Sequence, residues 1–134
     1  MAQAAADAMQ ERLVLFAVKI IDLVTCLPKT TAGRHVAGQV LRSGTSPAPN
    51  YAEARGAESR ADFVHKLRIA VEELHETGIC LLMILKAHMA SDPLVTGLVN
   101  ENGELACILG ASIRTAQAKG PQRTNDKRPL INDQ

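Results

Sequence analysis

The sequence predicts an all-α protein, an up-down-up-down four-helix bundle formed by residues 1–119. Hydrophobic residues make up 46% of the chain, and alanine and leucine, both strong helix formers, dominate among them. Aromatic residues make up only 2%, whereas β-sandwiches and barrels are normally rich in them. Apolar residues recur at three- and four-residue spacing in stretches separated by short breaks, as in helices joined by turns. An irregular three-helix domain with a loose fourth segment is the alternative.

The first predicted helix runs from about residue 4 to residue 27, and Pro28 ends it. Residues at three- and four-residue spacing form its apolar face: Leu13, Phe16, Ala17, Ile20, Val24 and Leu27.

The second helix begins after Thr30 and Thr31, which offer N-cap hydroxyls. Prolines inside a helix cost about 3 kcal/mol each, so we expect a kink or a break near Pro47 and Pro49, with a helix again over residues 51–55. The prolines leave backbone groups without partners. We expect Asn50 and Glu53 to form a polar lock that bonds to these groups.

The third helix has the clearest pattern. Ser59 and Asp62 resemble a capping box, and no helix breaker follows before Asp92, apart from a glycine. Residues 79–85 are apolar on every side, and such a helix must be covered on every side. Because a four-helix bundle leaves an outer face open, we expect a subunit interface here. The candidates for this interface or for helix packing are Leu81, Met83, Ile84 and Leu85.

The fourth helix begins at Asp92 and Pro93, an N-cap followed by proline at the first helical position. We expect it to fray at residues 100–103 and to continue from Glu104 to Lys119. Residues 120–134 contain two prolines and show no periodicity, so we predict a disordered C-terminal tail.

The composition limits where the protein can be located in the cell and what it can bind. The net charge is +1, which is not typical of a dedicated nucleic-acid domain. The N-terminal residues carry acids and no basic segment, so they predict no signal peptide, and the longest apolar run is too short to span a bilayer. The three cysteines lie in apolar runs without CxxC spacing. We therefore expect a reduced, cytoplasmic protein that does not contact a membrane.

No motif for catalysis is present. Glu72 and His75 form one Glu-x-x-His motif, but bundles that hold two metal ions use two such motifs. A solvated helix face is the simpler interpretation. The sequence also has no phosphate-binding loop and no nucleophile elbow. We predict no enzyme, no metal and no cofactor; a ferritin-like metal-binding bundle is the least favoured alternative.

Several charged residues crowd the middle of the chain. Glu72 and Glu76 are like charges one turn apart. Arg68 can compensate the charge of Glu72; otherwise the two acids face Arg42 or Arg55 from a neighbouring helix or subunit, or they form a solvated acidic face. If the cations converge they could bind phosphates, although no aromatic residues lie between them to stack bases. The candidate nucleic-acid contacts are Arg42, Arg55, Arg60, Lys66 and Arg68.

Four blocks together resemble a known family. They are residues 41–46 (LRSGTS), 50–54 (NYAEA), 59–67 (SRADFVHKL) and the Glu76-Thr77 pair, and residues 109–116 are similar to the same family's last helix. These blocks resemble the four-helix bundle family of 23S ribosomal RNA intervening-sequence proteins, over roughly residues 13–119. The sequence departs from the family pattern at Pro47 and Pro49, and at residues 78–80, where Gly-Ile-Cys replaces aromatics and should change the packing.

The resemblance implies a small bacterial four-helix bundle that assembles as a homopentamer and has no assigned enzymatic activity. Some members are encoded inside insertions in 23S ribosomal RNA genes. We therefore expect a non-enzymatic homo-oligomeric scaffold or adaptor whose main partner is itself. The alternative is an accessory protein that binds ribosomal RNA or another nucleic acid, and an unidentified protein or RNA partner remains open.

Overall fold

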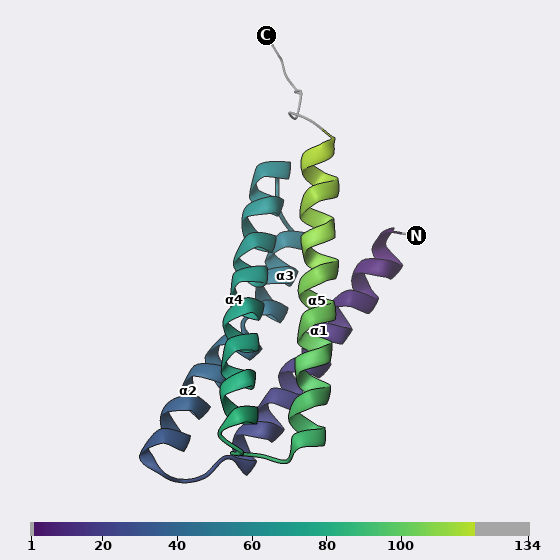
Figure 1. The fold of residues 1–134 in the computed structure, drawn as a ribbon. Helices are drawn as coiled ribbons and strands as arrows, with labels where there is room; N and C mark the ends of the chain where they lie inside the picture. Colours follow the sequence, from purple (N-terminus) through teal and green to yellow (C-terminus); the bar gives the residue numbers. More distant parts are fainter. Residues whose placement is uncertain (1, 120–134) are drawn as a thin grey trace, which may run out of the picture.

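The computed structural model describes residues 2–119, which form five α-helices and no strand (Figure 1). The helices are α1 (Ala2–Cys26), α2 (Thr31–Thr45), α3 (Pro47–Arg55), α4 (Arg60–Lys86) and α5 (Asp92–Ala118). Since α3 continues the course of α2, the five helices make the four antiparallel columns of an up-down-up-down bundle, as predicted. The predicted tail, 120–134, lies outside the described residues.

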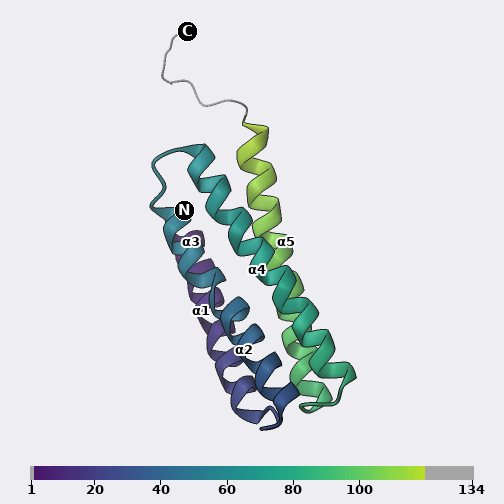
Figure 2. The same ribbon diagram turned by 90° about the vertical axis from the view of Figure 1, so that its left-hand side faces the viewer.

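The order of the columns places α1 and α4 diagonally across the bundle. α4 packs against α2, α3 and α5, and α1 packs against the same three helices, but the backbones of α1 and α4 do not come close to each other. Figure 2 shows α1, α2 and α3 on one side of the molecule and α4 and α5 on the other. The outward faces of α1 and α4 therefore lie on opposite sides of the molecule.

Two helices begin at the predicted caps. The Thr30 hydroxyl accepts a hydrogen bond from the Gly33 amide (3.0 Å) at the start of α2, and the Ser59 hydroxyl accepts one from the Asp62 amide (3.0 Å) at the start of α4. Each bond satisfies an amide that has no partner inside its own helix. These caps fix the two ends of the bundle.

Of the kink or break predicted in the second column, the structure shows the kink, a bend at Ser46. Ser46, between α2 and α3, keeps helical backbone angles (φ −78°, ψ −35°). The helix resumes at Pro47, earlier than the predicted residue 51, because proline is well suited to a first helical position, where an amide would lack a partner anyway. Just before the bend, Gly44 lies against α1; a Cβ there would stand 2.8 Å from Ile20 Cγ1.

The expected fraying of α5 at residues 100–103 is wrong, because α5 is continuous. Asn102 points into the bundle, and its Nδ2 donates to the backbone carbonyl of Leu74 on α4 (2.9 Å). Gly78 makes room for this amide, since a Cβ there would lie 3.0 Å from Nδ2. The small residue at position 78 thus leaves space for a buried polar contact between α4 and α5.

The core is formed by one apolar stripe from each column. Its largest fully buried side chains are Phe16, Leu13, Ile20, Leu23, Leu67, Leu74, Leu81, Ile84, Leu105, Leu109, Val40 and Val95. None of the helices in the described region is long and apolar enough to cross a membrane.

Candidate functional site

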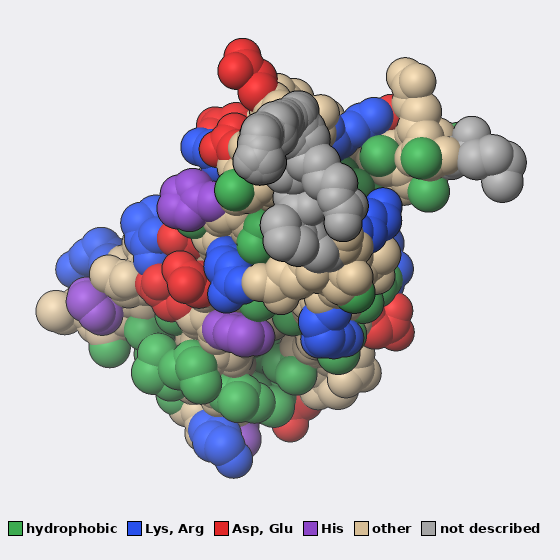
Figure 3. Space-filling model, turned by 90° about the horizontal axis from the view of Figure 1, so that it is seen from above, with side chains coloured by type: hydrophobic (Ala, Val, Ile, Leu, Met, Phe, Trp, Pro, Cys, Tyr) green, Lys and Arg blue, Asp and Glu red, His purple; other side chains and the backbone are tan. Residues whose placement is uncertain are grey.

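The outer side of α4 is apolar and uncovered. Ile79 is 60% exposed, Met83 48% and Leu82 39%. We call this surface, together with His75 and Lys86 at its two ends, the α4 face. In Figure 3 hydrophobic side chains gather at the lower left of the molecule, on the side that α4 occupies in Figure 1.

The four residues predicted for this region divide between two roles. Leu81 and Ile84 are fully buried in the core, and Leu85 is partly buried against it, so these three serve helix packing. Met83 alone belongs to the exposed α4 face. The apolar residues between 79 and 85 thus lie partly on the buried inner side of α4 and partly on its exposed outer side.

A second uncovered apolar surface lies on α1, and the sequence prediction missed it. Its side chains, 41–51% exposed, are Val14, Leu15, Val18 and Ile21. We call them, with Glu11 and Asp22 at the two ends, the α1 face. The sequence contains a signal for this surface, because residues 13–18 are six apolar residues in succession. A helix with a single buried face cannot bury all six of them.

One groove adjoins the α4 face. It runs between α4 and α5, and it is lined by Val71, His75, Ala106, Cys107, Gly110 and Arg114. No carboxylate of the described residues forms an ion pair with His75 or Arg114. The upper end of the α4 face therefore carries the guanidinium of Arg114 and the imidazole of His75.

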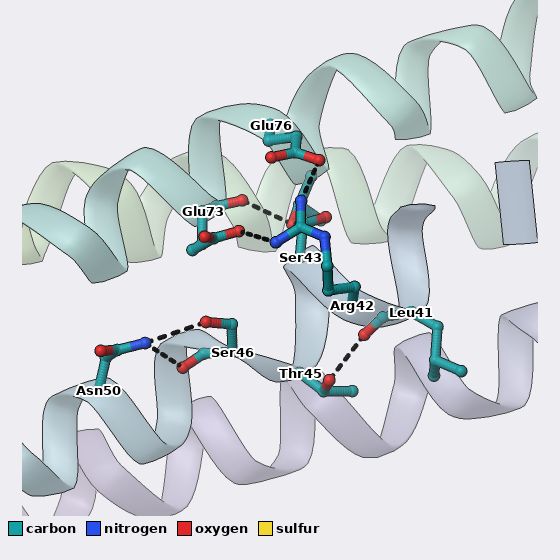
Figure 4. Close-up of polar contacts among 9 residues, drawn as sticks. Leu41, Arg42, Ser43, Thr45, Ser46, Asn50, Glu73 and Glu76 are labelled. Atoms are coloured by element: carbon teal, nitrogen blue, oxygen red, sulfur yellow. Dashed lines mark hydrogen bonds and ion pairs between the residues drawn. The ribbon is translucent and has the colours of Figure 1, made fainter. Parts of the chain in front are cut away.

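Arg42 joins α2 to α4. Its guanidinium donates to Glu73 Oε1 (3.0 Å) and to Glu76 Oε2, and hydrogen bonds to Glu76 and Glu73 raise the pKa of Arg42 (Figure 4). Beneath this pair, the buried hydroxyls of Ser43 and Thr77 are hydrogen-bonded at 2.8 Å. Glu76 thus takes the first of its two predicted arrangements, facing Arg42 across the bundle.

Of the two residues predicted to form a polar lock at the bend, only Asn50 bonds to it. Asn50 Nδ2 donates to the backbone carbonyl (3.0 Å) and to the hydroxyl (2.9 Å) of Ser46, so it bridges the bend, as Figure 4 shows. Glu53 does not join it. Its carboxylate accepts a hydrogen bond from Lys66 Nζ (2.7 Å), which ties α3 to α4 and raises the pKa of Lys66.

The candidate nucleic-acid contacts are mostly occupied within the chain. Besides Arg42 and Lys66, Arg55 pairs with Asp7 (2.7 Å) and Arg60 also has interactions with its surroundings. Of these five candidates, only Arg68 forms no ion pair or side-chain hydrogen bond with the described part of the chain. A phosphate would have to compete with carboxylates at the paired positions, so the geometry gives the nucleic-acid alternative little support; it stays a prediction.

A further ion-pair cluster, not predicted from the sequence, fixes α1 to α5. Arg12 donates to Glu101 (2.7 and 2.8 Å) and to Glu104 (2.5 Å). Hydrogen bonding to Arg12 lowers the pKa of Glu101. The residues are about 90 positions apart in sequence, so no local pattern could have paired them.

Metal ligands do not gather in the described part of the chain. Between residues 2 and 119, no three His, Cys, Asp or Glu side chains are placed to hold a metal ion together. Glu72 and His75 lie exposed on the outer side of α4. The ferritin-like alternative therefore has no set of donors in this region.

Comparison with known proteins places the chain in a family. The model of the 23S rRNA-intervening sequence proteins matches residues 8–111, which include all of the bundle except the first turns of α1 and the last turns of α5. The chain belongs to this family. The blocks around the α2–α3 bend and at the start of α4 that suggested the resemblance all lie in the matched region.

A similar protein whose structure has been solved has the same fold. It is a protein of unknown function from the S23 ribosomal protein family of Bacteroides thetaiotaomicron. The two chains are 31% identical, with a TM-score of 0.75, over 81% of this chain and 97% of the other. No curated protein matches this sequence. Neither the family's description nor that of the solved protein names an enzymatic activity.

Proposed function

We propose that this 23S rRNA-intervening sequence protein is a non-enzymatic, homo-oligomeric helical scaffold, a pentamer as the sequence resemblance implies. Its assembled surface would present binding sites to an unidentified partner. Its three cysteines are free, which fits a reducing compartment such as the cytoplasm. The observation that carries this proposal is the uncovered apolar surface of α4.

The exposed α4 side chains make self-association favourable. Fully burying a large aliphatic side chain contributes about 1.5–3 kcal/mol. Ile79, Leu82 and Met83 still expose 39–60% of their surface in the single chain, so covering them gives roughly 3 kcal/mol. The α1 face offers a similar gain on the opposite side. Monomeric proteins rarely leave large apolar patches open, and two such surfaces on one small bundle favour an assembly.

Light scattering behind size exclusion tests this proposal. We expect a particle several times heavier than the 14.4 kDa chain at micromolar concentration. Ile79→Glu should reduce the mass toward that of one chain, because it places a carboxylate inside the contact. The matched control is Ile108→Glu, on α5 outside both faces, and it should leave the mass unchanged. A wild-type particle of one chain at all concentrations would refute the proposal.

A further inference from the structure

We propose that the α1 face of one copy packs against the α4 face of the next copy, so that the assembly grows head to tail through two different surfaces. This inference rests on the proposed self-association and adds which surfaces meet. It names a second copy of this chain as the occupant of each face.

The bracketed segments of the two faces match in length, and each carries a row of exposed apolar side chains. The apolar part of the α1 face extends from Val14 to Ile21, and that of the α4 face from Ile79 to Met83. The residues that bracket these segments are eleven positions apart on each helix: Glu11 and Asp22 on α1, His75 and Lys86 on α4. Eleven residues of α-helix span about 16 Å, so the two bracketed segments are equally long.

The residues at the ends of the two faces have opposite charges. The α1 face ends in two carboxylates, Glu11 and Asp22, whereas the α4 face ends in Lys86 at one end and in His75 with Arg114 of the adjoining groove at the other. Neither these carboxylates nor Lys86 and Arg114 form an ion pair within the described part of the chain. All of them are therefore available to a neighbouring copy.

Three other charges border the faces. Glu76 follows His75 within the bracketed segment of α4, but its carboxylate is already bonded to Arg42 of the same chain. Lys19 lies at the side of α1 toward α5, where its charge acts on Glu101, and Glu72 lies about one turn beyond His75, outside the bracketed segment. Contact between two α1 faces would oppose acid to acid, and contact between two α4 faces would oppose cation to cation. Like charges brought together disfavour both symmetric contacts, so the charges select the mixed contact.

The positions of the faces determine how such contacts continue. Because α1 and α4 lie diagonally across the bundle, each copy carries one face of each kind on opposite sides. A contact between two different surfaces cannot close a two-fold dimer; it produces a ring or an open chain. α1 and α4 also run in the same direction, and rotation about an axis along the bundle keeps them parallel between copies. Asp22 then lies toward Lys86, and Glu11 toward Arg114.

Mixing two face-blocked variants tests the pairing. Val18→Glu blocks the α1 face and Ile79→Glu blocks the α4 face; both positions are exposed, so circular dichroism should show an intact fold. Each variant alone should be a single chain of 14.4 kDa. An equimolar mixture should give a 1:1 complex of about 28.8 kDa, twice one chain, and nothing larger, because only one good pair of faces remains. The two blocked faces both carry a new carboxylate and cannot compensate each other.

Other results would contradict the inference in distinct ways. If Ile79→Glu alone still dimerises, two α1 faces meet; if Val18→Glu alone does, two α4 faces meet. A mixture that stays monomeric while the wild type is oligomeric also overturns the pairing but leaves the proposed scaffold intact. A monomeric wild type refutes the scaffold itself.

A charge exchange provides a second test that does not depend on blocking a face. Asp22→Lys and Lys86→Asp should each weaken association about tenfold, the equivalent of one favourable ion pair replaced by repulsion. The double variant should recover to near the wild-type affinity. A double variant as weak as the single ones would contradict the parallel contact between these two residues.

Discussion

At the residue level, the turn after α4 shows how the chain stops a long helix without glycine. His88 has a backbone φ of 55°, in the left-handed region that favours glycine. Its amide donates to the Leu85 carbonyl (3.1 Å) and the Met89 amide donates to the Ile84 carbonyl (3.0 Å). This is the hydrogen-bond pattern of a Schellman C-cap, with His88 at the position that is usually glycine.

His88→Gly should therefore stabilise the fold. Removing the Cβ relieves the left-handed backbone, and we expect the free energy of unfolding to rise by about 0.5–1 kcal/mol in urea denaturation. His88→Ala is the matched control, since it removes the imidazole but keeps the strain, and it should give no gain. Equal effects of the two changes would show that the backbone angle is not the cause.

The Arg12–Glu101 pair predicts a pH dependence. The hydrogen bond from Arg12 lowers the pKa of Glu101 from its ordinary value of 4.5, so the folded chain holds this carboxylate ionised more strongly than the unfolded chain does. The resulting stability is fully present above about pH 4.5, and it is lost as the pH falls from there through the folded pKa. The pair is partly exposed, so we expect only about 0.5–1 kcal/mol.

Thermal unfolding of Glu101→Gln between pH 3 and pH 7 measures this contribution. The variant should be less stable than the wild type at neutral pH, and the two curves should converge in acid. Glu104→Gln is the control, and its effect should be smaller because that carboxylate is 68% exposed. A constant difference between the wild type and Glu101→Gln over the whole range would contradict the account.

At the level of elements, the two glycines of α2 serve different purposes. Gly44 lies against the buried Ile20 side chain of α1, whereas nothing lies within 4 Å of the place where a Cβ would stand on Gly38. Replacing glycine with alanine should therefore have opposite effects on stability at these two positions of α2.

Gly44→Ala should lower the free energy of unfolding by about 1–3 kcal/mol, because the new methyl group overlaps Ile20 Cγ1 and Cγ2. Gly38→Ala should raise it by about 0.5–1 kcal/mol, because alanine is the better helix former in an exposed position. Chemical denaturation of the two variants in parallel gives the comparison. Stabilisation by Gly44→Ala would mean that α1 and α2 are not as close as described.

Local patterns in the sequence were enough to predict the helices, the caps at Thr30 and Ser59 and the bend at Pro47, because each depends on neighbours in the chain. They were not enough for Asn102. A polar residue near a glycine reads as a weak point, yet its partner is the Leu74 carbonyl on another helix. Periodicity likewise showed that residues 79–85 are apolar all round, but only the packing decides that Ile84 faces inward and Met83 outward.

At the level of the whole molecule, self-association should be visible in thermal stability. An oligomer gains stability from mass action, so its unfolding midpoint rises with protein concentration, whereas a monomer's midpoint does not change. We expect this dependence over a hundredfold range of concentration for the wild type, and its loss in Ile79→Glu. Differential scanning calorimetry at several concentrations measures it. A midpoint that is independent of concentration for the wild type would speak against an assembly.

The central claim is that copies of this chain cover the apolar outer sides of each other's α1 and α4. Sedimentation equilibrium of the wild-type protein, at several concentrations in the micromolar range, tests it most directly. The account predicts an assembly whose mass is a whole multiple, above two, of the 14.4 kDa chain. A single species of 14.4 kDa at every concentration, with Ile79 and Val18 open to solvent, would contradict it.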